Sequence, residues 1–323
     1  MVRLMEQKCK SERSNMAKRP DYFCNWPKPQ GQQVPCIQKQ SELRMFLYTE
    51  EFPETSDLNW LIASTENITV GEYQLSPGSH FSPADVHAGD EIYYVMKGEV
   101  TMFQPESGQV MVVGEGEGIL MPKGCPHIGY NFTEDKSHML YAIAPKIWGE
   151  DGPPSDYTGA VRLYKFEERG GAVREEASPV FSENAAPREG MRIDLGHFPA
   201  SGPEGREKKL FYKLTEQNGI KMISGTKTPA LMSVWASNDV MQFGTIKILT
   251  GGPAPQQTEY DTHAGDAIFY VMDGPATFFL PDRTQTFNVE PGDFMFIPQG
   301  ERYKIINYYG HTAKVLYFVA PEF

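Results

Sequence analysis

The sequence predicts an all-β protein made of two similar barrel domains that arose by duplication. The first observation is a segment that occurs twice, at residues 85–98 and again at residues 261–274. A second repeated pair has the same offset, since 263 − 87 and 303 − 127 both equal 176. The third observation is a series of short segments in which apolar and polar residues alternate, which is typical of strands. No long helical pattern competes with them.

Length and charge limit the class of protein. A chain of 323 residues is long enough for two domains that each bury a core of their own. The net charge of −12 argues against binding to nucleic acid or to an anionic membrane surface. No apolar run approaches the roughly 18 residues that span a bilayer, and the first residues lack an apolar signal core. We therefore expect a soluble protein without membrane or nucleic-acid partners.

Cysteine usage indicates the compartment. Of the four cysteines, three lie in the first 36 residues, and none has the spacing of a metal site. They form no disulfide framework for a chain of this size, so we expect a cytoplasmic protein. Cys125 lies two residues before His127, and we interpret it as a small buried side chain in a turn.

Composition divides the chain into four regions. Residues 1–43 are polar and interrupted by prolines, which predicts a partly flexible N-terminal arm. Residues 44–150 form the first barrel domain, with the metal site discussed below. Residues 151–215 are rich in turn formers and charges and predict an interdomain linker, with an edge strand at 161–166. Residues 216–323 form the second barrel domain.

Four side chains of the first repeat are candidates to meet at one point. Alternate residues of a strand face the same side, so Asp85 and His87 share a face. After an Ala-Gly-Asp turn, Glu91 and Tyr93 can return to that face, and His127 follows a Pro-x-Gly turn. Imidazoles and carboxylates are metal ligands, so the set predicts a site for one divalent metal ion.

The second repeat keeps only part of this set. Asp261 and His263 are retained, whereas Ala267 and Tyr303 stand in place of the glutamate and the second histidine. Two ligands are too few for tight coordination, so we expect no metal there. We expect apolar side chains to fill this barrel, with a small-molecule pocket as the alternative. Asn307 ends the second motif as Asn131 does in the first repeat, which indicates a turn-stabilising role.

Both pairs of motifs resemble the two signatures of the cupin superfamily. The second signature, Gly-x5-Pro-x-Gly-x2-His-x3-Asn, matches residues 116–131 at every defined position. The first matches at His87, Glu91 and Gly98, but Asp85 stands where a histidine is usual, and Gly78 lies one residue too far away. The resemblance implies a bicupin with two β-barrels of jelly-roll type, commonly a homodimer. It also implies metal binding by Asp85, His87, Glu91 and His127.

The ligand set leaves the metal and the chemistry open. Two imidazoles and one carboxylate suit Fe(II) with positions left for oxygen and substrate, and we favour this metal. If Asp85 also binds, the ligand set favours Mn(II), Zn(II) or Fe(II) in a non-redox role. Ni(II) is a further alternative. If Asp85 stays unbound, it is a candidate general base. Tyr93 is a candidate for substrate binding, with core packing as the alternative interpretation.

Three functions follow from these alternatives. The favoured one is an Fe(II)-type dioxygenase of a small aromatic, enol or diketone substrate. The second is a non-redox isomerase, lyase or epimerase that acts on a hydroxy-carbonyl or sugar-like substrate. The third is a non-catalytic cupin that binds a small molecule. Phosphate-binding glycine loops, a serine-hydrolase elbow and a His-Glu-x-x-His motif are all missing from the sequence.

Overall fold

The computed structural model of the chain describes most of the two predicted barrels and parts of the segments around them. The described residues are 23–28, 31–47, 58–81, 84–147, 157, 159–161, 195–200, 202–256 and 259–321. The expected edge strand at 161–166 lies outside them from residue 162 onward. Almost all regular structure in the described residues is β-strand, with one short α-helix, α3 (Gly202–Lys208).

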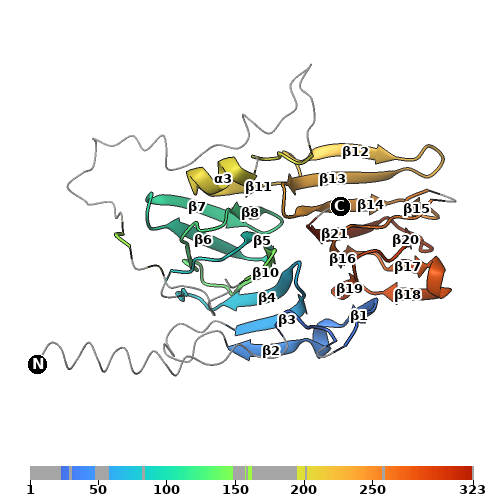
Figure 1. Cartoon of the computed structure of the whole chain (residues 1–323), viewed down its shortest axis with the longest axis horizontal. Helices are drawn as coiled ribbons and strands as arrows, with labels where there is room; N and C mark the ends of the chain where they lie inside the picture. The colour runs from blue at the N-terminus through green and yellow to red at the C-terminus, as the bar shows by residue number, and fades with distance from the viewer. Residues whose placement is uncertain are drawn as a thin grey trace, which may run out of the picture.

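The first barrel is built on a sheet of seven strands, most of them from the first repeat (Figure 1). In spatial order these strands are β11 (Tyr212–Leu214), β8 (Gly118–Met121), β5 (Asp90–Lys97), β10 (Ser137–Ala144), β4 (Thr69–Leu75), β3 (Leu58–Ser64) and β2 (Arg44–Leu47). A smaller sheet completes the barrel with β7 (Gln109–Gly114), β6 (Glu99–Gln104) and β9 (Ile128–Tyr130). All pairings are antiparallel.

The second barrel repeats this arrangement. Its large sheet contains, in spatial order, β1 (Cys36–Gln38), β19 (Phe294–Ile297), β16 (Asp266–Asp273), β21 (Ala313–Ala320), β14 (Gln242–Ile248), β13 (Ala230–Ser237) and β12 (Ile220–Ser224). Its small sheet contains β15 (Pro253–Ala254), β20 (Lys304–Ile306), β17 (Ala276–Leu280) and β18 (Gln285–Val289). Short 3₁₀ turns occur at Gln40–Glu42 and Pro281–Arg283. The predicted all-β fold with two barrels is confirmed.

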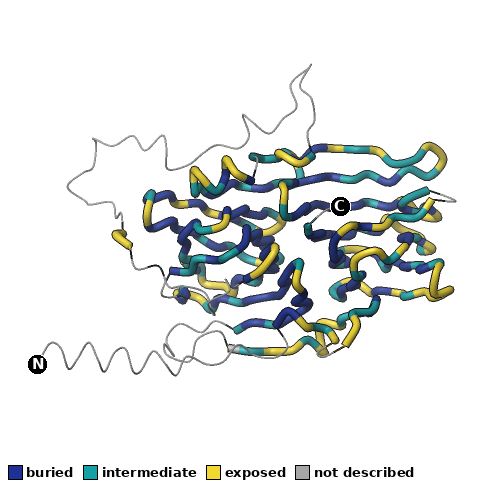
Figure 2. The backbone as a smooth tube through the Cα atoms, viewed as in Figure 1, coloured by how far each residue is buried: buried dark blue, intermediate teal, exposed yellow. Residues whose placement is uncertain are grey.

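Alternation along each central strand separates two cores. On β5, Tyr93 and Val95 face the interior of the first barrel, whereas Ile92 and Tyr94 face the other way. The outward residues pack with their counterparts from β16 and with Trp235 and the neighbouring strands of the second barrel, in one cluster shared by the two barrels. A third cluster fills the second barrel. Most residues of β5 and β16 are buried, on both faces of the sheet (Figure 2).

Each barrel receives one strand from the segment that precedes the other barrel. The strand β1 pairs with β19 of the second barrel, and β11 pairs with β8 of the first. Figure 1 shows β1, in blue, beside the orange and red strands, and β11, in yellow, beside the green ones. The two strands are themselves related by the repeat, since 212 − 36 equals 176. The predicted boundaries at residues 43 and 215 therefore lie between β1 and β2 and between β11 and β12.

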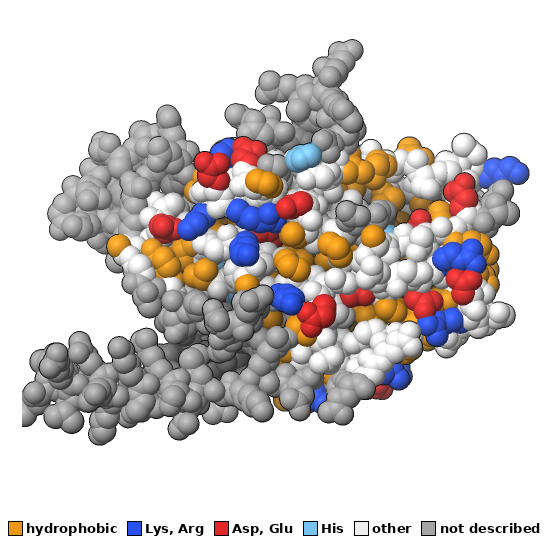
Figure 3. Space-filling model, viewed as in Figure 1, with side chains coloured by type: hydrophobic (Ala, Val, Ile, Leu, Met, Phe, Trp, Pro, Cys, Tyr) orange, Lys and Arg blue, Asp and Glu red, His pale blue; other side chains and the backbone are white. Residues whose placement is uncertain are grey.

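The surface of the described residues has no large basic area in the view of Figure 3. Acidic and basic side chains are interspersed over the described part of that face. No helix among the described residues is long and apolar enough to cross a bilayer.

Candidate metal centre

A two-residue bridge joins the two motifs of the first repeat. The backbone N–H of Asp85 donates to the carbonyl of His127 at 2.9 Å, and the N–H of His127 donates to the carbonyl of Asp85 at 3.0 Å. The ligand atoms of Asp85, His87 and His127 all lie within 4.8 Å of one another. The segments that the sequence analysis paired by their offset thus meet at one point in the barrel.

Glu91 reaches the same point from β5. Its Oε2 atom lies 3.3 Å from Nε2 of His87 and 3.0 Å from Nε2 of His127. Both histidines and Glu91 are buried, whereas Asp85 is partly exposed. Tyr93 stands two residues further along β5, and its hydroxyl donates a hydrogen bond to the Glu91 carboxylate. All four predicted metal-site residues are therefore together, and Tyr93 lies beside them.

The orientation of His127 is set by its own turn. Its Nδ1 atom lies 3.0 Å from the backbone carbonyl of Cys125. Because a carbonyl oxygen only accepts, Nδ1 carries a proton, and Nε2 faces the Glu91 carboxylate. Cys125 itself is buried, and its Sγ atom donates to the carbonyl of Lys209 at 3.1 Å, consistent with the structural role expected for it.

Burial and mutual charge set the protonation of the group. Burial lowers the pKa of His87 to about 4 although Glu91 opposes this, so His87 is neutral near pH 7. The pKa of Glu91 is lowered despite its burial because the two imidazoles favour its charge. The pKa of His127 is raised despite burial, chiefly by Glu91. His87 and Glu91 are therefore already in the forms that bind a metal, a neutral imidazole and an ionised carboxylate.

These residues fit a cation. The Glu91 carboxylate is buried, and its Oε2 atom lies 3.3 Å from Nε2 of His87 and 3.0 Å from Nε2 of His127. A buried carboxylate charge is costly, and a cation held by these donors would offset that cost. The nitrogen and oxygen donors suit a divalent first-row metal.

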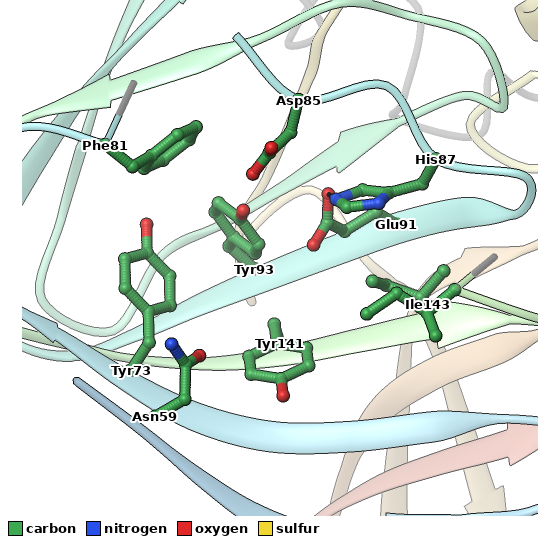
Figure 4. A pocket seen from close by; sticks show the side chains of 10 residues that line it. Asn59, Tyr73, Phe81, Asp85, His87, Glu91, Tyr93, Tyr141 and Ile143 are labelled. Carbon is green, nitrogen blue, oxygen red and sulfur yellow. Dashed lines mark ion pairs between the residues drawn. The ribbon is translucent and has the colours of Figure 1, made fainter. Parts of the chain in front are cut away.

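A small cavity, with a volume of about 30 Å³, opens beside Asp85, His87 and Glu91. Its walls are Asn59, Tyr73, Phe81, Asp85, His87, Glu91, Tyr93, Tyr141, Ile143 and Ile147. Figure 4 shows Asp85, His87 and Glu91 on one side of the cavity and Asn59 with Tyr73 on the other. Asp85 is the only lining residue that is not buried, which places it at the mouth.

Sequence reasoning missed Asn59, Tyr73 and Tyr141, which come from β3, β4 and β10. A signal existed, because the repeat continues through all three strands, with the offset of 176 on β10 and a different offset on β3 and β4. Asn59 pairs with Tyr73 as Met232 pairs with Ile246, an offset of 173 instead of 176. Tyr141 packs over Gly71, where an added Cβ atom would collide with its hydroxyl oxygen.

In the second barrel the corresponding point is closed. The hydroxyl of Tyr303 lies 2.5 Å from Nε2 of His263. Burial lowers the pKa of His263 to about 4, so the ring is neutral and Nε2 accepts the hydrogen bond from Tyr303. Ala267 and Phe269 are fully buried in the apolar cluster around them. The nitrogen that could have bound a metal is therefore already occupied by a hydroxyl group.

The asparagines that end the two second motifs have defined positions. Asn131 donates to the carbonyls of Leu75 and Asp135, and Asn307 makes the same bonds to Ile248 and His311. The turn-stabilising role of both asparagines is confirmed. His80 stacks on Tyr130 at 5.3 Å and does not line the cavity.

Comparison with known protein families identifies one domain in the first barrel. Residues 71–143 match the family described as the cupin domain. No curated protein sequence matches the chain. The first barrel therefore contains a segment that matches the cupin domain, and the second barrel repeats its strand arrangement.

Solved structures agree with this fold over nearly the whole chain. A putative glyoxylate-induced protein from Pseudomonas aeruginosa has a TM-score of 0.58 at 14% identity, covering 94% of this chain and 97% of its own. A mutant of oxalate decarboxylase from Bacillus subtilis has a TM-score of 0.55 at 14% identity, with 97% of this chain and 83% of its own covered. The protein Ylba from E. coli has a TM-score of 0.54 at 11% identity, with 96% of both chains covered.

Proposed function

We propose that the protein is a metal-dependent enzyme whose first barrel binds one divalent first-row metal ion through Asp85, His87, Glu91 and His127. The observation that carries this proposal is the convergence of these donors. The Asp85 carboxylate lies within 4.8 Å of both imidazole nitrogens, and Glu91 lies 3.3 and 3.0 Å from them. We assign the reaction to the non-redox class, an isomerase, lyase or epimerase of a hydroxy-carbonyl or sugar-like substrate.

The reaction class follows from Asp85. A second carboxylate in the donor set adds negative charge and oxygen character, which favours Lewis-acid chemistry over oxygen activation. Asp85, His87, Glu91 and His127 would hold the ion, and its chemistry there would be the polarisation of a substrate carbonyl. Asp85 stands at the cavity mouth, so its second carboxylate oxygen can accept a proton from the carbon next to that carbonyl.

Other residues of the chain hold this geometry and exclude water. Tyr93 donates to Glu91 and so orients its carboxylate. We therefore assign Tyr93 a positioning role beside the reacting atoms. Phe81, Ile143 and Ile147 are buried and form the apolar part of the wall. They lower the local dielectric, which strengthens every charge interaction inside the cavity.

The Fe(II)-type dioxygenase is the second candidate, and a specific observation favours it. His87, Glu91 and His127 are the three most buried donors, and they form a two-histidine, one-carboxylate set without Asp85. The apolar wall also suits an aromatic, enol or diketone substrate. A homodimer and a cytoplasmic location belong to the same proposal and rest on the family resemblance and the composition.

The requirement for oxygen separates the two candidates. Protein purified without chelator is analysed for metal and assayed, loaded with Fe(II) or with Mn(II), against hydroxy-carbonyls, sugar acids, catechols and diketones. Turnover that persists under argon with Mn(II) supports the non-redox reaction. Oxygen consumption in step with substrate loss supports the dioxygenase. Metal without any turnover indicates the non-catalytic binding protein, and untreated protein without metal contradicts the proposal.

A further inference from the structure

The cavity beside the metal group lacks a positive side chain. Among the described residues that line it, none is Lys or Arg. The metal ion assigned in the proposed function carries two positive charges, and Asp85 with Glu91 supplies two negative ones. The occupied site is therefore close to neutral before a substrate enters.

This charge balance acts against an anionic substrate. A dicarboxylate would bring two uncompensated negative charges into a site whose lining residues are buried apart from Asp85. Burial of unpaired charge costs several kcal/mol, and no lining cation offsets that cost. An uncharged ligand avoids it.

The wall across from His87 is polar but uncharged. Asn59 is 5% exposed and Tyr73 is 3% exposed, so both side chains belong to the interior (Figure 4). An amide supplies a donor and an acceptor, and a phenol supplies one of each. Such groups match the hydroxyl and carbonyl oxygens of a neutral ligand.

The second barrel shows that this polar wall accompanies the metal residues. Met232 and Ile246 occupy the positions of Asn59 and Tyr73, because the same two strands pair in the same register. Tyr141, in contrast, keeps a tyrosine counterpart, Tyr317, opposite Gly244. Asn59 and Tyr73 therefore differ between the barrels together with the metal donors, whereas the third tyrosine belongs to the shared framework.

Volume sets the size of the ligand. The cavity measures about 30 Å³. One water needs about 10–15 Å³ by this measure, so roughly two water-sized groups fit beside the metal position. The part of the substrate that enters is a fragment of a few heavy atoms, and any remainder extends past Asp85 at the mouth.

We infer that the cavity selects the uncharged hydroxy-carbonyl end of a small molecule, and that Asn59 is the residue that determines this specificity. Tyr73 supports it from the neighbouring strand. The inference rests on the proposed function, because the metal ion provides the other half of the ligand's contacts.

The test uses the full chain loaded with Co(II), whose visible absorption reports ligands at the metal. Hydroxyacetone and glycolate are titrated separately, since they have similar size and differ in charge. A free divalent metal favours the carboxylate of glycolate. In this cavity we expect that preference to be lost, with hydroxyacetone binding at least as tightly as glycolate. A preference for glycolate of about tenfold or more overturns the inference.

Variants test whether Asn59 determines the preference for an uncharged ligand. Asn59→Leu should weaken hydroxyacetone about tenfold and glycolate less than about threefold, because only the neutral ligand loses its partner. Met232→Leu, the matched change in the second barrel, should alter neither affinity. If Asn59→Leu loses cobalt, Tyr73→Phe takes its place, with the same direction expected. Unchanged hydroxyacetone affinity in a variant that retains cobalt overturns the inference, whereas wild-type protein that fails to bind cobalt contradicts the proposed function.

Discussion

The two barrels share one backbone design and differ in what fills them. Asp85 and Asp261 make the same backbone bridge, to His127 and to Tyr303 respectively. The asparagine at the end of each second motif makes the same bonds to the turn. In the first barrel the enclosed space holds a cavity beside a cluster of imidazole and carboxylate side chains, and in the second it holds an apolar core.

Few substitutions separate these states. Glu91 corresponds to Ala267, and His127 to Tyr303, at an offset of 176, while Asn59 corresponds to Met232. The strand hydrogen bonds come from the backbone, so the barrel persists when its interior changes from polar to apolar. The comparison teaches that the site depends on interior side chains that the fold itself does not require.

The largest expected effect is loss of the metal from the first barrel. Glu91→Ala removes the carboxylate that lies against both imidazoles and should weaken metal binding by at least about a hundredfold. Activity should disappear with the metal. Elemental analysis after gel filtration measures the metal content. Asp261→Ala in the second barrel is the control and should leave metal and activity intact. Equal loss in the two variants would mean that the barrels were assigned the wrong way round.

The reverse change should create a site in the second barrel. Ala267→Glu with Tyr303→His restores the donor set around Asp261 and His263, and we expect a second metal ion per chain. Without metal, the new buried carboxylate should destabilise the protein by several kcal/mol. Added metal should recover the melting temperature. Tyr303→Phe is the control, since it breaks the bond to His263 without adding a donor. A double variant that binds no additional metal would show that the second barrel differs in more than its donors.

The sequence was sufficient to predict the duplication, the two barrels and the convergence of Asp85, His87, Glu91 and His127, because these depend on motifs with one constant offset. The four donors come from two short segments, Asp85 to Glu91 and the turn that leads to His127. Their convergence then follows from the alternation of side chains along a strand and from the turn that brings the second motif back to the same barrel interior.

The polar wall could not be found in the same way. Its residues lie on β3 and β4, where the offset between the repeats is 173, so a search at 176 places them out of register. A one-residue slip on a strand moves a side chain from one face to the other, and interior positions therefore stay undefined until pairing is known. The exchange of β1 and β11 between barrels was hidden for a different reason, since strands of three residues carry little pattern.

A smaller difference concerns the aspartates that begin β5 and β16. Asp90 accepts hydrogen bonds from the Arg206 guanidinium at 3.1 and 2.9 Å, whereas Asp266 accepts from Thr65 and Asn67 at 2.6 and 3.0 Å. Arg206→Met leaves the buried Asp90 charge without its cation and should lower the free energy of unfolding by about 3 kcal/mol.

The matched change beside Asp266 is Thr65→Val, between β3 and β4, which removes a neutral donor and should cost about 1 kcal/mol. Urea unfolding measures both losses. Because Asp90 directly precedes Glu91, Arg206→Met should also weaken metal binding, which Thr65→Val should not. Equal stability losses with unchanged metal affinity would remove any special role of Arg206 in the first barrel.

The smallest effect concerns Asp261, the counterpart of Asp85. Burial, with a contribution from Glu259, raises the pKa of Asp261 to about 6, and Lys304 opposes this only in part. Its folded-state pKa exceeds the unfolded value, so the protonated form is favoured in the fold, and stability falls as pH rises from about 4 to 6. Asp261→Asn should therefore stabilise the protein at pH 7 by about 1–2 kcal/mol and have no effect below pH 4. Thermal unfolding of both proteins across this range measures the difference. A difference that does not change with pH would show that the Asp261 carboxylate carries no burial cost, and that the second barrel tolerates a charge without a cation beside it.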